Sequence, residues 1–230
     1  MSYKENTTTI KQDVLGKKSW LYCNSGKDGE WDSLVENVEK TKEKYLQYVE
    51  GRDVVITAGG HIGMYVRFFA QHFKRVYAFE PDPIHFHCMV NNNQLDNVVK
   101  IQAALGDEHR LVNVGFGRPG TRQSYKVQDE RILEGNFEAK TEPYIPLLKI
   151  DDLNLPCCDL IQLDIEDYEY YAIRGAVETL RRHKPVVILE NGQQEKTASI
   201  MRELNYQLVD VVQADSVFKY SGSQWQVVFR

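Results

Sequence analysis

The chain has 230 residues, of which 42% are hydrophobic and 27% are charged, and its formal net charge at pH 7 is -5. This composition is that of a globular protein with a sizeable core, and the negative charge argues against a nucleic-acid partner. The polar first residues lack the apolar core of a signal peptide, and no stretch approaches the roughly 20 apolar residues of a membrane span. We therefore expect no membrane association.

Four cysteines occur, without a C-x-x-C pair or the spacing of a zinc site. Their scatter is unlike a secreted disulfide framework, which favours reduced thiols and a cytoplasmic protein. The cysteines are Cys23, Cys88, Cys157 and Cys158.

The first 50 residues form an extension that we expect to pack on a main domain at 51–230. Residues 1–30 are polar and irregular, and apolar residues at helical spacing predict a helix over Trp31–Tyr48. Asp32 or Ser33 would cap this helix, which is expected to end near Gly51.

From residue 53 onward, short apolar runs alternate with helical patterns, which predicts parallel βαβ units in a doubly wound α/β sheet. The expected strands are Asp53–Ile56, Val76–Phe79, Val98–Leu105, Leu111–Phe116, Ile145–Ile150, Asp159–Leu163, Val186–Leu189, Tyr206–Val212 and Gln226–Phe229. The expected helices are Ile62–Phe73, Ile84–Gln94, Tyr168–Arg182 and Glu195–Leu204. We expect the last two strands to form an antiparallel hairpin. The polar, glycine-containing stretch within 117–144 is long enough to be a functional insertion or a lid.

Ligands of open α/β sheets bind beyond the carboxyl ends of the strands. After the first of these strands comes the loop AGGHIG, in which Gly59, Gly60 and Gly63 would let a backbone approach a cofactor closely. The spacing is not G-x-G-x-x-G, so a tight turn without a ligand is the alternative.

After the second strand, Glu80 stands about 20 residues beyond the glycines, where a carboxylate accepts hydrogen bonds from ribose hydroxyls. Pro81 stiffens the turn and fixes the direction of the carboxylate. The alternative role, capping the next helix, could fall to Asp82 instead. After the third strand, small residues around Ala104 leave room for an adenine ring, and Asp107 could contact its amine or belong to a plain turn.

After the fourth strand, the block DIEDYE places four carboxylates within six residues. Asp164 and Glu166 alternate with apolar neighbours and could point into one cleft, which Glu190 would face from the side. Such a cluster could supply a general base or hold a divalent cation, and we assign no metal ligands from it. Asp167 and Glu169 are better candidates for capping a helix.

Three blocks resemble the FkbM-type methyltransferases: VVITAGGHIGMY, RVYAFEPDP, and the segment that runs from LLKIDD through DIEDYE to VVILE. The resemblance covers roughly Val54–Glu190. It implies a seven-stranded Rossmann-like sheet of the class I methyltransferase type with a C-terminal antiparallel hairpin.

The resemblance also implies that S-adenosylmethionine is the cofactor. Gly59, Gly60, His61 and Gly63 would wrap its methionine part, Glu80 with Pro81 would hold the ribose, and Ala104 would flank the adenine. Asp164 and Glu166 would border the methyl-transfer cleft, with Asp164 also against the cofactor. The implied acceptor is a hydroxyl oxygen on a sugar or another small molecule.

The chain departs from the family pattern at four places. Thr57 stands where the family has an aspartate that helps anchor the cofactor's amino group, and Gly60-His61 replaces Ala-Asn. Gln162 replaces a common lysine, and Asp167 a common glycine. Two alternatives therefore stay open: a nicotinamide-dependent oxidoreductase, which also needs an acid for the ribose, and a degenerate protein that binds the cofactor without turnover.

Overall fold

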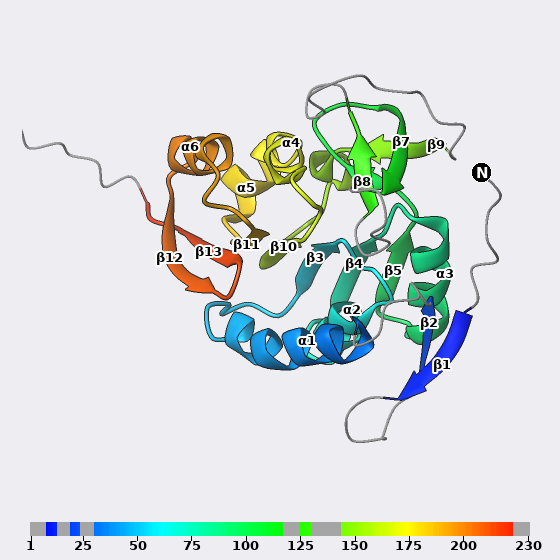
Figure 1. Cartoon of the computed structure of the whole chain (residues 1–230). Coiled ribbons are helices and arrows are strands. Elements are labelled where there is room, and N and C mark those ends of the chain that lie inside the picture. Colours follow the sequence, from blue (N-terminus) through cyan, green and yellow to red (C-terminus); the bar gives the residue numbers. More distant parts are fainter. Residues whose placement is uncertain (1–7, 13–18, 24–29, 117–124, 130–143, 223–230) are drawn as a thin grey trace, which may run out of the picture.

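A seven-stranded sheet forms the centre of the chain in the computed structural model, which describes residues 8–12, 19–23, 30–116, 125–129 and 144–222 (Figure 1). The strand order is β12-β13-β11-β10-β3-β4-β5. All neighbours are parallel except for the pairs that β13 makes. The strands are β3 (Val54–Ala58), β4 (Arg75–Phe79), β5 (Val98–Ile101), β10 (Leu160–Leu163), β11 (Val186–Glu190), β12 (Tyr206–Val212) and β13 (Asp215–Tyr220). The predicted doubly wound, seven-stranded α/β fold is confirmed.

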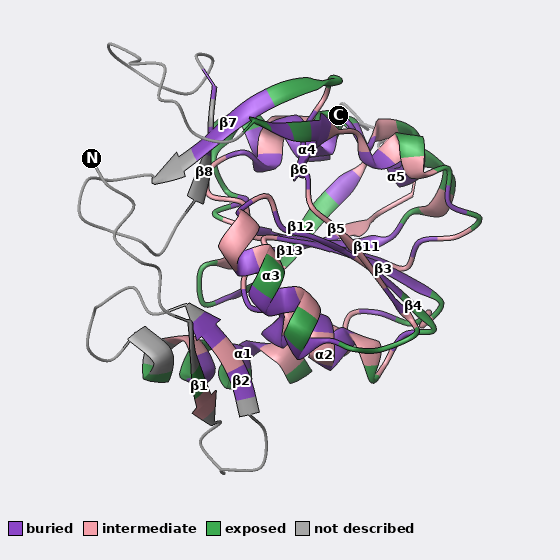
Figure 2. Cartoon of the chain, turned by 90° about the vertical axis from the view of Figure 1, so that its right-hand side faces the viewer, coloured by how far each residue is buried: buried purple, intermediate pink, exposed green. Residues whose placement is uncertain are grey.

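Helices cover both faces of this sheet and make three layers (Figures 1 and 2). One face carries α1 (Glu30–Leu46), α2 (Met64–Ala70) and α3 (Pro83–Asn92), and the other carries η1 (Ile150–Leu153), α4 (Glu169–Arg174), α5 (Val177–His183) and α6 (Glu195–Glu203). Because side chains alternate along a strand, Val55 packs with the first set of helices and Ile56 with the second. None of the described helices is both long and apolar enough to span a bilayer.

The closing hairpin exists, but its second strand is not the predicted one. β12 has the expected bounds, and it pairs with β13, which lies in the stretch that we expected to be a loop. β13 has hydrogen-bonded neighbours on both sides, and this pairing outweighs its weak apolar pattern. The predicted strand Gln226–Phe229 lies outside the described residues.

A second, four-stranded sheet stands beside the carboxyl ends of the central strands, with the order β6-β9-β7-β8. Its strands are β6 (Ala104–Leu105), β7 (Arg110–Phe116), β8 (Tyr125–Gln128) and β9 (Tyr144–Leu148). The predicted strand Val98–Leu105 is therefore divided between the two sheets, as β5 and β6. Most of the predicted lid lies outside the described residues, and its described part consists of β8, Asp129 and Tyr144.

Two further predictions need correction. The stretch expected to be irregular at the N-terminus contains a hairpin, β1 (Thr8–Gln12) with β2 (Ser19–Cys23), which lies against α3. Asn92 of α3 holds this hairpin because its side chain bonds both the N–H and the C=O of Leu21. The long helix expected over Tyr168–Arg182 is broken into α4 and α5 at Gly175, where a Cβ atom would lie only 1.9 Å from the carbonyl oxygen of Gly106.

The N-terminal helix is confirmed, but its predicted caps are wrong. α1 begins at Glu30, so that Asp32 and Ser33 lie within the helix instead of before it. Val35, Val38 and Tyr45 of α1 are buried, and Tyr45 joins the core beneath the central sheet.

Candidate functional site

A cavity of about 320 Å³ lies where β3 and β10 run side by side, at the point where the strand order reverses. That point is the expected ligand site of a doubly wound sheet. The lining comes from the loops that follow β3, β4 and β10, from the first turns of α2 and α3, and from β6, β8 and α1. Most of the predicted site residues line it: Gly59, Gly60, His61, Glu80, Pro81, Ala104, Asp164 and Glu166.

The glycine loop has a shape that only its own residues permit. Gly59 adopts a φ of 78°, and a Cβ atom at this position would lie 1.8 Å from the carbonyl oxygen of Asp164. The loop therefore packs directly against the end of β10. Gly63 does not line the cavity; it precedes the first residue of α2 with a φ of 91°, where it fixes how the helix leaves the loop.

Glu80 stands at the end of β4 with 4% of its surface exposed. Its two carboxylate oxygens accept hydrogen bonds from the N–H groups of Asp82, at 2.9 Å, and His61, at 2.7 Å. Burial raises the pKa of Glu80 to about 8, although both hydrogen bonds act in the opposite direction. Asp82 caps α3 by accepting from Ile84 and His85, so Glu80 is not needed as the cap.

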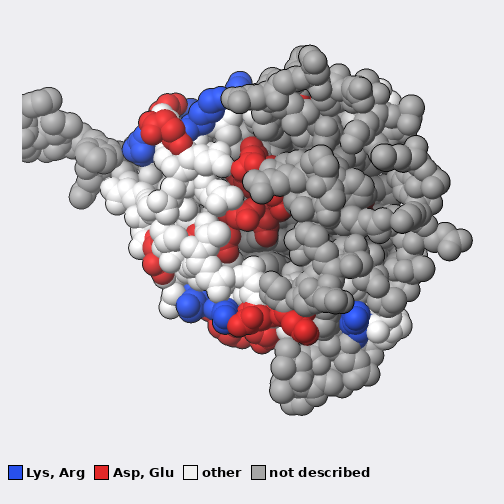
Figure 3. Space-filling view, viewed as in Figure 1, with Lys and Arg blue, Asp and Glu red and all other residues white. Residues whose placement is uncertain are grey.

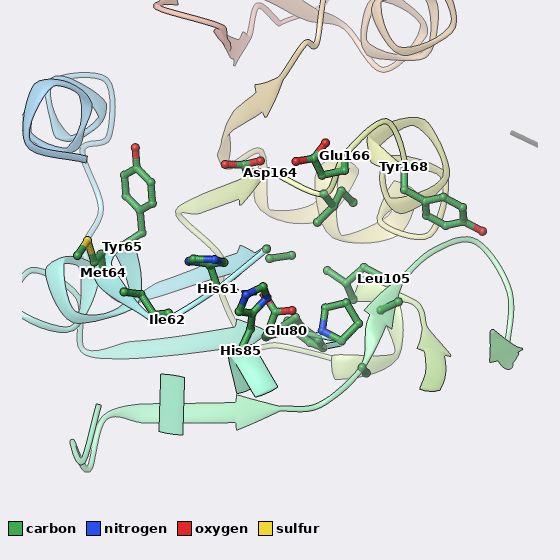
Figure 4. Close-up of a pocket in the computed structure, with 18 of the residues that line it drawn as sticks. His61, Ile62, Met64, Tyr65, Glu80, His85, Leu105, Asp164, Glu166 and Tyr168 are labelled. Atoms are coloured by element: carbon green, nitrogen blue, oxygen red, sulfur yellow. Dashed lines mark hydrogen bonds between the residues drawn. The ribbon is translucent and has the colours of Figure 1, made fainter. Parts of the chain in front are cut away.

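The imidazole rings of His61 and His85 lie side by side in the wall of the cavity, with ring centroids 4.1 Å apart (Figure 4). Burial lowers the pKa of both rings, that of His85 to about 4, so both are neutral at pH 7. The described lining contains no Lys or Arg either. The lining that the structure describes is therefore acidic or neutral throughout.

Three carboxyl groups converge at the other end of the cavity. Each of Asp164, Glu166 and Glu190 offers an oxygen that lies within 4.8 Å of the oxygens of the other two. Figure 4 shows the carboxylates of Asp164 and Glu166 turned toward each other, and Figure 3 shows acidic side chains gathered near the middle of this face. Burial, and next the charge of Glu190, raise the pKa of Asp164 well above its usual range. We call these three residues the acidic trio.

The helix α1 forms the wall that the sequence did not predict. Its residues Leu34, Asn37 and Val38 line the cavity. The hydroxyl of Tyr45 donates to Asp215 on β13. Asp215 lies opposite Glu190 in the antiparallel register of β13 and β11. α1 is thus tied to β13, the neighbour of the strand β11 that carries Glu190.

Thr57, predicted to lie against the cofactor, is absent from the described lining. Its side chain is buried within the sheet, where its hydroxyl donates to the amide oxygen of Gln162 on the neighbouring strand β10. Two of the departures from the family pattern are thus bonded to each other. Asp107 is outside the lining as well, and pairs with Arg174 at 3.2 Å.

Several lining residues were not predicted. Tyr65 and His85 lie in the first turns of α2 and α3, and their positions directly after the cofactor loops could have revealed them. Tyr168 lines the cavity and donates to Asp129 at 2.5 Å, and Val127 reaches it from β8. For Val127 and for the residues of α1, no local pattern signals the contact, because tertiary packing alone brings them there.

The profile of the "Methyltransferase FkbM domain" family matches residues 58–209, which is more than half of the chain. The chain belongs to this family. Its methyl donor, S-adenosylmethionine, is therefore the cofactor expected in the cavity, and the nicotinamide alternative loses its support. A comparison with curated proteins found no match.

Solved structures agree on the fold. The FkbM methyltransferase from Methylobacillus flagellatus KT superposes with a TM-score of 0.51 at 16% identity, over 85% of this chain and 56% of that one. TYW2 from M. jannaschii in complex with AdoMet gives 0.52 at 16% identity, over 96% of this chain and 90% of that one. The M. jannaschii tRNA m1G37 methyltransferase gives 0.50 at 10% identity, over 94% and 58%. At these identities the similarity establishes the fold alone.

Proposed function

We propose that the chain transfers the methyl group of S-adenosylmethionine to a hydroxyl oxygen of a small molecule, with a carbohydrate as the leading acceptor class. The observation that carries the proposal is one cavity that contains both a buried acid at the ribose position, Glu80, and a group of acids at its other end. Its volume of about 320 Å³ is in the range of small-molecule sites.

The cofactor would lie along the loop from Gly59 to His61, with its ribose hydroxyls on Glu80. Its adenine would lie beside Ala104 and Pro81, which both line the cavity. TYW2, which shares the fold, was solved in complex with AdoMet, and this supports a cofactor at the same edge of the sheet.

In the proposed reaction the acceptor oxygen attacks the methyl carbon as the sulfur–methyl bond breaks, and the sulfonium becomes a neutral thioether. The hydroxyl proton passes to Asp164 or Glu166, which both line the cavity. The reaction depends mainly on holding the oxygen in line with the methyl group in a site with little water.

The acids also bear on the class of acceptor. tRNA methyltransferases share the fold, but a nucleic acid would bring phosphates toward a lining that has carboxylates and, where the structure describes it, no Lys or Arg. Repulsion would oppose such a complex. A neutral, hydroxyl-bearing acceptor would meet no such penalty.

Calorimetric titration with S-adenosylmethionine, S-adenosylhomocysteine and NADH tests the cofactor assignment. We expect binding of the first two ligands and none of NADH. Transfer of a labelled methyl group to a panel of sugars, amines and tRNA then tests the acceptor class. Binding without transfer to any acceptor would support a degenerate cofactor-binding protein, and failure to bind either S-adenosyl compound would overturn the proposal.

The role of the acids is tested with Asp164→Asn and Glu166→Gln in the same transfer assay. Each substitution keeps the shape of the side chain and removes its ability to accept the proton, so we expect losses of about 10²-fold or more in rate if that residue is the base. The matched control is Glu203→Gln, because Glu203 is exposed on α6, away from the cavity lining. Unchanged rates in both variants would exclude a general base among these two residues.

A further inference from the structure

We propose that the side-chain amide of Asn37, on α1, donates a hydrogen bond to the carboxylate of the cofactor's methionine part. The match to the family profile begins at residue 58, so α1 lies outside the matched segment. Asn37 nevertheless lines the cavity. The inference rests on the proposed position of the cofactor, with its ribose on Glu80, and makes α1 a part of the cofactor site.

The first observation is the direction in which the cavity runs. Glu80 and Leu105 lie toward one end of it, Tyr65 lies toward the other end, and His61 lies between them (Figure 4). The Tyr65 end is next to α1, because the Tyr65 ring stacks on that of Tyr45 with centroids 5.7 Å apart. With its ribose on Glu80, the cofactor would therefore extend its methionine part toward α1.

The second observation is the distribution of charge around that part of the cofactor, which carries both an ammonium and a carboxylate. Asp164 and Glu166, two members of the acidic trio, line the cavity, so they attract the ammonium and repel the carboxylate. The carboxylate should therefore turn away from the trio, toward the wall between α1 and the start of α2. The apolar residues of this wall are Leu34, Val38, Ile62 and Met64.

The third observation is that this wall contains a suitable donor. Asn37 carries the one side-chain amide in the described lining, and it has no hydrogen-bond partner among the described residues. It is also exposed, so a ligand can reach it. The hydroxyl of Tyr65 lies at the same end, but it is already hydrogen-bonded to Thr41 and lies 3.4 Å from the hydroxyl of Tyr45. Asn37 is thus the described side chain most free to donate to the carboxylate.

The turn of α1 that carries Asn37 is held in place by buried contacts. Oγ1 of Thr41 donates to the carbonyl oxygen of Asn37 at 2.9 Å and shares a hydrogen bond with the hydroxyl of Tyr65. One turn later, Tyr45 donates to Asp215 on β13. Because these contacts fix α1 against α2 and the central sheet, little freedom of the helix is lost when Asn37 binds a ligand.

The test compares two ligands by calorimetric titration of the full chain. One is S-adenosylhomocysteine, and the other is S-adenosyl-3-thiopropylamine, which keeps the ammonium and lacks the carboxylate. We expect Asn37→Ala to weaken binding of the first about fivefold, through loss of one hydrogen bond, and of the second less than about twofold. Asn37→Asp should weaken binding of S-adenosylhomocysteine further, because two carboxylates then meet, and added salt should reduce this extra loss.

The matched control is Gln207→Glu, which also turns an amide into an acid, on the exposed part of β12 outside the described lining. It should bind both ligands like the unmodified chain. Retained affinity for S-adenosyl-3-thiopropylamine shows that the Asn37 variants are folded.

The remaining results separate this inference from the proposed function. Unchanged affinity of Asn37→Ala for S-adenosylhomocysteine, or equal weakening of both ligands, would overturn the role of Asn37 and leave the methyltransferase proposal intact. If the unmodified chain binds neither ligand, the proposed function itself fails, and the role of Asn37 fails with it.

Discussion

Two carboxyl groups, those of Glu80 and Asp164, line the same cavity but have different hydrogen-bonding neighbours. Glu80, at the end of β4, accepts hydrogen bonds from two backbone N–H groups. Asp164, at the end of β10, instead lies within hydrogen-bonding reach of another acid, Glu190, whose charge raises its pKa further. Both are strand-end acids whose pKa is raised by burial, so burial alone does not distinguish them. Their neighbours do.

The difference lies in how the surroundings of each carboxyl group affect its ionised form. Around Glu80 the protein has already satisfied and oriented the carboxylate, as suits a group that receives neutral hydroxyls without moving. Around Asp164 the protein has gathered like charges, which disfavour its ionised form. The hydrogen-bonding neighbours of Glu80 thus stabilise its ionised form, and those of Asp164 oppose it.

The largest change in cofactor affinity is expected at the Glu80 end. Glu80→Ala removes the proposed acceptor of the ribose hydroxyls and leaves the N–H groups of His61 and Asp82 without their partner. Because each of the two hydrogen bonds to the ribose hydroxyls contributes about 0.5–1.5 kcal/mol, we expect the affinity for S-adenosylhomocysteine to fall about tenfold. Calorimetric titration measures this change. Equal affinities for the variant and the unmodified chain would show that the ribose lies elsewhere.

At the Asp164 end, an isosteric change should have the opposite sign for stability. In Glu190→Gln, an amide that can donate to Asp164 replaces a carboxyl group that repels it. We expect the free energy of unfolding of the ligand-free protein to rise by about 1 kcal/mol, measured by urea unfolding at pH 7. Glu203→Gln should stay within about 0.5 kcal/mol of the unmodified chain. A clear loss of stability in Glu190→Gln would contradict the contrast drawn between the two ends.

The Glu80 end was largely predictable because its parts are close in sequence and lie on strands with strong apolar patterns. The loop after β3 and the acid after β4 belong to adjacent parallel strands, so their spacing places them at one edge of the sheet. Asp82 as the cap of α3 also followed from its position before Pro83.

The Asp164 end was predictable only in part. The sequence indicated that Asp164, Glu166 and Glu190 meet, but it gave no sign that α1 closes the cavity with Asn37 and Val38. An amphipathic pattern shows that a helix packs on something and does not name the partner. The same limit explains β13, whose place between β11 and β12 comes from pairing on both sides.

The pH dependence of stability offers a finer test of Glu80. Burial raises its pKa from 4.5 to about 8, so between these values the folded empty protein holds a proton that the unfolded chain has lost. This contribution to the free energy of unfolding is complete below pH 4.5 and declines by up to about 1.4 kcal/mol per pH unit as the pH rises toward 8. Glu80→Gln cannot titrate, and its stability should therefore fall less between pH 5.5 and 7.5 in urea unfolding. Parallel curves for the two proteins would refute a raised pKa at this position.

The smallest effect on the cofactor is expected at Thr57, which the sequence placed against it. Thr57→Val keeps the shape of the side chain and removes its hydrogen bond to Gln162, both of which are buried. We expect a loss of about 1 kcal/mol in the free energy of unfolding, because the amide oxygen of Gln162 loses its donor. The affinity for S-adenosylhomocysteine should change less than twofold, because Thr57 is absent from the described lining. A tenfold weaker affinity with unchanged stability would instead show that Thr57 contributes to cofactor binding. Binding at the Glu80 end would then depend on the sheet beneath the glycine loop as well as on the loop itself.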